Sequence, residues 1–136
     1  MVRDIIKDII FLSQKSVPVE TEDLFIVQDL RDTLSANRES CVGMAANMIG
    51  YRKNIIVVTV GSTDLILLNP VIVKKAIPYT TVEGCLSLEG QHKTTRFRKI
   101  VVRFQDEKMI YHTQEFYGWV AQIIQHEIDH LHGIII

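Results

Sequence analysis

Gln125-His126-Glu127-Ile128-Asp129-His130 decides how this sequence is interpreted, because it contains the pattern H-E-x-x-H. Residues i and i+4 of an α-helix are offset by about 40° and one turn, so His126 and His130 would project from one face. Two imidazoles on one face can bind one metal ion. Glu127 lies beside the first of them, where a carboxylate can take a proton from a metal-bound water. The pattern therefore indicates metal-dependent hydrolysis.

The residues before this motif predict the rest of the fold. After Glu115 the apolar spacing becomes helical, and Gly133 is placed to end that helix. Upstream, apolar runs predict strands at 55–60, 65–68, 71–74, 80–82, 100–105 and 109–113. Earlier still, the sequence predicts helices over 4–12 and, capped by Thr21, over about 22–37. Strands that do not alternate with helices favour an α+β class, with antiparallel or mixed sheets packed around the C-terminal helix.

Composition limits the classes of protein that fit. A length of 136 residues suits a single domain over 1–136, and the 47% of hydrophobic residues can form a core. The formal net charge of -1 gives no electrostatic reason to expect nucleic acid or an anionic membrane as a partner. No apolar run approaches the roughly 20 residues of a membrane span. Charged residues near the N-terminus argue against a signal peptide, so we expect a cytoplasmic protein.

A catalytic metal site usually has three protein ligands, so a third ligand is expected elsewhere in the sequence. Cys85 is the best candidate, because it follows a predicted strand in Glu83-Gly84-Cys85-Leu86-Ser87 and a thiolate is a strong ligand. The alternative is a buried, inert thiol. For Cys41, apolar filling of the core is the main interpretation, with metal or redox chemistry as the alternative. Two cysteines are too few for a disulfide scaffold.

Three blocks of this sequence resemble the peptide deformylase family. Glu83-Gly84-Cys85-Leu86-Ser87 matches the family's E-G-C-hydrophobic-S, and residues 125–133 match its Q-H-E-hydrophobic-D-H-L-x-G. Residues 41–48, Cys-Val-Gly-Met-Ala-Ala-Asn-Met, are an altered form of its G-hydrophobic-G-hydrophobic-A-A-x-Q. The blocks also agree in order and spacing.

The resemblance implies a deformylase-like fold and a hydrolase that removes the formyl group from N-formylmethionyl peptides of nascent chains. It implies Cys85, His126 and His130 as ligands of one divalent metal, usually Fe²⁺, with Zn²⁺ or Ni²⁺ as substitutes. Glu127 would be the general base toward the metal-bound water. The backbone N–H of Leu86 would help to hold the oxyanion. The partners implied are formyl-Met peptides close to the ribosome, with neither direct nucleic acid binding nor a membrane.

The substrate side departs from the family pattern. Met48 stands where the family has the glutamine that donates to the oxyanion, and a thioether cannot donate a hydrogen bond. Asn47 occupies the variable position before it, and Cys41 replaces the first glycine of the block. The residues expected to line the substrate site, by resemblance or by their place on the ligand face, are Val42, Gly43, Glu83, Gly84, Trp119 and Ile123.

Three functional hypotheses stay open at this point. The first is an active deformylase slowed by Met48. The second is a metal-binding, deformylase-like protein with lost or altered activity, acting as a peptide-binding module or on another small amide. The third places both cysteines and both histidines around a closed structural zinc. A cluster of basic residues is interpreted as a solvated strand edge: Arg96, Arg98, Lys99 and Arg103.

Overall fold

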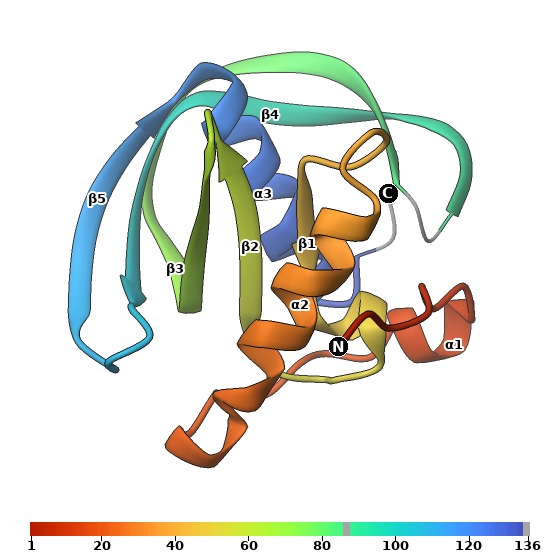
Figure 1. Ribbon diagram of the computed structural model, residues 1–136. Coiled ribbons are helices and arrows are strands. Elements are labelled where there is room, and N and C mark those ends of the chain that lie inside the picture. The colour runs from red at the N-terminus through yellow and green to blue at the C-terminus, as the bar shows by residue number, and fades with distance from the viewer. Residues whose placement is uncertain (86–87, 135–136) are drawn as a thin grey trace.

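A computed structural model of the chain describes residues 1–85 and 88–134 (Figure 1). The elements follow in the order α1 (Ile9–Leu12), η1 (Thr21–Asp23), α2 (Phe25–Ala36), β1 (Gly43–Ala45), η2 (Ala46–Ile49), β2 (Ile55–Val60), β3 (Thr63–Cys85), β4 (Leu88–Gln105), β5 (Tyr111–Tyr117) and α3 (Gly118–Leu131). The strands form one sheet in the order β1-β2-β3-β4-β5, each antiparallel to the next. The predicted α+β class, with the last helix against the sheet, is confirmed.

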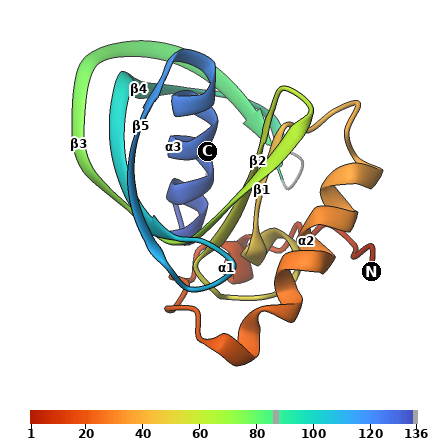
Figure 2. The same ribbon diagram turned by 60° about the vertical axis from the view of Figure 1, so that its left-hand side comes forward.

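Strand β2 forms the centre of the core. Helix α3 packs on one side of β1 and β2, and α2 lies on the other (Figure 2). Because β2 is covered on both faces, its residues 55–58 form a continuous apolar run instead of alternating with polar residues, and all four are fully buried. The strand predicted at 55–60 is confirmed at both ends.

Strands β3 and β4 are much longer than predicted, and with β5 they curl around α3 (Figure 2). The three short strands expected at 65–68, 71–74 and 80–82 are parts of β3. The prolines explain the error, because Pro70 falls in a break of register between Leu68 and Val71. Pro78 follows Ile77, which has a φ of 65°. In a sequence pattern, such interruptions predict the end of a strand. In the structure, bulges let the strand continue past them.

The predicted helix over 4–12 is wrong except for its last turn, α1. The preceding backbone bonds elsewhere: the N–H of Arg3 donates to Oγ1 of Thr33, and the N–H of Ile6 donates to the carbonyl of Met48. Thr21 starts η1 and does not cap α2. Helix α3 begins later than predicted, because Tyr117 still pairs with β4. No helix in the described ranges combines the length and apolarity that crossing a membrane requires.

Gly133 follows the end of α3, as predicted, and gives the first testable expectation. Its φ is 75°, and a Cβ there would lie 2.3 Å from the carbonyl oxygen of Ser13. Gly133→Ala is expected to lower the free energy of unfolding by about 2–4 kcal/mol, the combined cost of a left-handed non-glycine residue and a backbone clash. Urea unfolding at fixed metal concentration measures the change.

Gly61→Ala is the matched control for Gly133→Ala. Gly61 has a φ of 61°, but a Cβ there would meet no atom of the described residues within 4 Å. This variant should lose only the conformational part, about 1–2 kcal/mol. Equal losses in the two variants would show that the contact with Ser13 adds nothing.

Candidate metal centre and adjoining cavity

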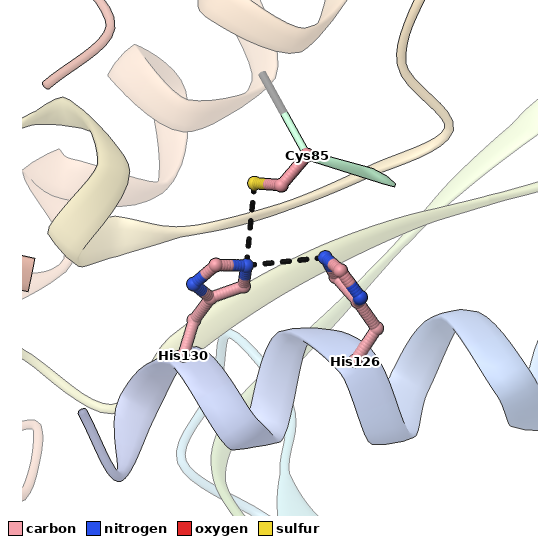
Figure 3. Close-up of side chains that lie close together, drawn as sticks. All are labelled: Cys85, His126 and His130. Carbon is pink, nitrogen blue, oxygen red and sulfur yellow. Dashed lines mark hydrogen bonds between the residues drawn. The ribbon is translucent and has the colours of Figure 1, made fainter. Parts of the chain in front are cut away.

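Helix α3 carries the proposed ligands His126 and His130 one turn apart, on the side that faces β1 and the end of β3 (Figure 3). Both imidazoles are buried, and their Nε2 atoms lie 3.1 Å apart. Glu127 is also buried, at 4% exposure. Gln125 anchors the same turn to β4, because its side-chain amide bonds the backbone N–H and carbonyl of Phe97.

Cys85, at the end of β3, completes a group of three ligand atoms. Its Sγ lies 3.3 Å from Nε2 of His130, and the ligand atoms of Cys85, His126 and His130 all lie within 4.8 Å of one another. Ligand atoms bound tetrahedrally at about 2.1 Å lie about 3.4 Å apart, so the three atoms fit one metal ion. One thiolate with two imidazoles also suits Fe²⁺, Ni²⁺ or Zn²⁺.

Electrostatics around the group favour a cation. Burial would by itself lower the pKa of His126, but hydrogen bonds with Cys85 and Glu83 raise it to about 10. The surroundings that favour a proton on this ring also favour a metal cation beside it. Burial, and then the neighbouring His126, lower the pKa of His130 to about 3, which leaves that imidazole neutral and able to ligate.

Glu127 has an unused oxygen at this centre. Its Oε1 is buried without a hydrogen-bond partner in the described residues, and burial raises the pKa of the carboxyl to about 7. An unpaired buried carboxylate is costly, and one that titrates near neutral pH suits proton transfer. The position therefore supports the role of general base that the sequence motif suggests.

A cavity of about 430 Å³ opens beside the metal centre. All six residues expected on the substrate side border it, as do Met48, Cys85, His126 and Glu127. The Glu83 carboxylate, however, accepts hydrogen bonds from Arg96, Gln122 and His126. It therefore supports the proposed ligand His126 and does not offer a free group to substrate. Trp119 is 62% exposed and lies at the mouth of the cavity.

Gly43 allows β1 to approach α3 closely. A Cβ at this position would lie 2.5 Å from Cγ2 of Ile123 and 3.1 Å from Oε2 of Glu127. Only glycine therefore permits this spacing between β1 and Glu127.

Met48 offers no donor to the cavity. It is buried, and its Sδ accepts a hydrogen bond from the N–H of Ala45 at 3.4 Å. The neighbouring Asn47 is fully buried, is not among the described residues that line the cavity, and its Nδ2 donates to the carbonyl of His130, so it does not replace the missing donor. The predicted contribution of Leu86 lies outside the described residues.

Cys41 borders the cavity but does not join the metal-ligand group. Its thiol donates to the carbonyl of Gly43. Burial, and then the charge of Glu127, raise the pKa of Cys41 to about 12, which keeps it a thiol. This geometry argues against the closed zinc site with two cysteines.

The prediction that Arg96 lies on a solvated strand edge is wrong. Arg98 and Arg103 are exposed, but Arg96 is 3% exposed and lies beneath α3. It bonds both Glu83 and Asp129. No local pattern marks this residue, and only the pairing of β3 with β4 brings it to Glu83.

Comparisons with known proteins match this geometry to one family. The family model for polypeptide deformylase matches residues 4–136. The chain belongs to the peptide deformylase family. It is 52% identical, over the full length of both chains, to a peptide deformylase of Clostridium beijerinckii. The family predicted from three sequence blocks is thereby confirmed, as is the assignment to the deformylase enzymes.

Solved deformylases share the whole fold. A peptide deformylase from Legionella pneumophila superposes with a TM-score of 0.89 at 30% identity, covering 98% of this chain and 82% of that one. The actinonin-bound class I type b peptide deformylase from Acinetobacter baumannii superposes with a TM-score of 0.89 at 26% identity, covering 99% of this chain and 95% of that one. The deformylase-like fold is therefore confirmed over nearly the full chain.

Proposed function

We propose that this chain is a metal-dependent hydrolase that removes the formyl group from N-formylmethionyl peptides. One observation carries the proposal: the Cys85, His126 and His130 ligand atoms lie together at the wall of a cavity, beside a Glu127 carboxylate oxygen that has no partner among residues 1–85 and 88–134. Membership of the deformylase family supports the same reaction.

The chemistry divides between the metal and the protein. Cys85, His126 and His130 would hold a divalent metal, which would supply acidification of a water and polarisation of a carbonyl oxygen. Glu127 then takes the proton of the attacking water and returns it to the leaving amine, a transfer that its near-neutral pKa suits. Because Oε1 has no other partner in the described residues, it is available for this hydrogen bond.

We propose Fe²⁺ as the metal in the cell, with Zn²⁺ or Ni²⁺ as substitutes. The methionine side chain would lie in the cavity against Val42, Trp119 and Ile123, all of which border it. The partners would be the formylated N-termini of nascent chains near the ribosome, in the cytoplasm. The backbone N–H of Leu86 stays a proposed oxyanion donor.

A formate-release assay tests the proposed function. Protein loaded anaerobically with Fe²⁺ or Ni²⁺ is expected to release formate from a formyl-Met peptide, and chelated protein is expected to release none. Acetyl-Met peptide is the control substrate. Fully metallated protein that releases formate no faster than buffer contradicts the proposal.

Met48 favours the alternative, a metal-binding protein with lost or altered activity that acts as a peptide-binding module or on another small amide. Its thioether accepts a hydrogen bond where the family pattern has a donor. Metallated protein that binds a formyl-Met peptide without cleaving it would support this alternative.

A further inference from the structure

Arg96 joins two carboxylates beneath the metal centre. Its Nε and Nη2 donate to Glu83 at 2.7–3.1 Å, and its Nη1 donates to Oδ2 of Asp129 at 2.6 Å. The Arg96 side chain is 4% exposed. A planar guanidinium has donors in a fixed fork, so these bonds fix both carboxylates relative to β4.

Both carboxylates lie next to proposed ligands. Glu83 accepts a hydrogen bond from Nδ1 of His126 at 2.8 Å and another from Nε2 of Gln122 at 2.9 Å. Because the carboxylate only accepts, His126 carries a hydrogen on Nδ1, which leaves Nε2, on the side of Cys85 and His130, as the ring atom that can bind a metal. Asp129 directly precedes His130 on α3.

We propose that Arg96 is a positioning residue for the metal centre, holding Glu83 and Asp129 together so that His126 keeps the orientation and tautomer that metal binding needs. The inference rests on the proposed function for its metal. Arg96 is not among the described residues that line the cavity, and it acts through Glu83.

Replacing Arg96 would take hydrogen bonds away from a buried carboxylate that supports a proposed ligand. Glu83 would keep its bonds to His126 and Gln122 but lose three from the guanidinium. With fewer bonds to β4, the Glu83 carboxylate would hold the Nδ1 N–H of His126 in a less fixed position. Lysine at this position would supply a charge but not the fork that spans both carboxylates.

Metal affinity in the purified apoprotein is the test. Co²⁺ affinity is measured by competition with a chelator for wild type, Arg96→Gln, Arg96→Lys, Glu83→Gln and the double variant Glu83→Gln/Arg96→Gln. Arg103→Gln is the matched control, because Arg103 is an exposed arginine of the same strand that stacks on Tyr111. Thermal unfolding of each apoprotein sets a temperature at which all are folded.

Arg96→Gln is expected to bind Co²⁺ about 10–100-fold more weakly than wild type, with a changed Co²⁺ absorption spectrum, while Arg103→Gln stays within about twofold. Arg96→Lys should fall between them. The double variant should be no weaker than Glu83→Gln by more than about twofold, because Arg96 acts through Glu83.

A purely structural role for Arg96 predicts something different. It would lower the unfolding temperature of the apoprotein but leave the Co²⁺ affinity and spectrum of the folded variant unchanged, and that result would overturn the inference. Additive losses in the double variant would also overturn it. Should Arg96→Gln not fold, Arg96→Lys gives the same comparison. Formate release is not the readout, so failure of the proposed reaction leaves this test intact.

Discussion

Glu127→Gln is expected to lower kcat for formate release by about 10²–10⁴-fold while the protein still binds one metal ion. The amide has nearly the shape of the carboxyl, so the packing against Gly43 is kept, but it cannot accept and return a proton. The ligand atoms of Cys85, His126 and His130 are untouched by the change. Metal content by elemental analysis and formate release are measured on the same sample.

The free energy of unfolding distinguishes loss of the general base in Glu127→Gln from a general loss of folding. Glu127 is buried, and its Oε1 has no partner in the part of the chain that the structure describes, so replacing it with a neutral amide should leave the free energy of unfolding unchanged or raise it. Glu115→Gln is the control, because Glu115 is an exposed carboxylate of β5 and should keep full activity. Should activity fall only in proportion to lost metal, Glu127 would be a residue for metal retention and not a base.

The residues of α3 could be placed from sequence because helix geometry is local. An i, i+4 spacing fixes His126 and His130 on one face whatever the rest of the chain does. Cys85 is 41 positions before His126, and its approach depends on the length of β3. Residue type and the preceding predicted strand made Cys85 a candidate, and the resemblance to a family implied its role as a ligand. The structure brings its Sγ to 3.3 Å from Nε2 of His130.

Arg96 shows what a local pattern misses. It lies among Arg98, Lys99 and Arg103, so the run has the composition of a solvated strand. Strand alternation would put Arg96 and Lys99 on opposite faces of the sheet but Arg96 and Arg98 on the same face. Which of these side chains is buried therefore depends on how the strands pair. Tyr79 pairs with Arg96, which puts the guanidinium on the face of the sheet that carries Glu83. The partner carboxylates are 13 and 33 residues away, beyond any window of local reasoning.

In the fold as well, elements with a strong local signal were predicted correctly, and elements decided by tertiary contacts were not. The buried strand β2 has a dense apolar signal of the right length and was predicted at both ends. The N-terminal segment has helical spacing, yet its backbone bonds Thr33 and Met48 in preference to itself. A short helix is marginal without packing, so a few tertiary hydrogen bonds suffice to unwind most of it.

Met48→Gln is expected to raise kcat on the order of 10²-fold, the usual effect of one oxyanion donor. The buried Met48 thioether accepts the N–H of Ala45. A glutamine side chain has similar length, so its carbonyl oxygen can take over this hydrogen bond. Its NH₂ group is then left to face the cavity that Met48 already borders. Steady-state formate release at saturating metal measures the gain.

Met48→Leu is the matched control for Met48→Gln, because it keeps the volume, provides no donor and should leave kcat within a few-fold of wild type. Glu127→Gln/Met48→Gln should stay far slower than Met48→Gln, since a better oxyanion site cannot replace the base. A folded, fully metallated Met48→Gln enzyme no faster than Met48→Leu would contradict the expectation. Asn47 donates to the carbonyl of His130 and would not take the place of the glutamine. The negative charge of the oxyanion would then be stabilised by the metal and by backbone donors. In that case the absence of the glutamine would have little effect on the rate of this enzyme.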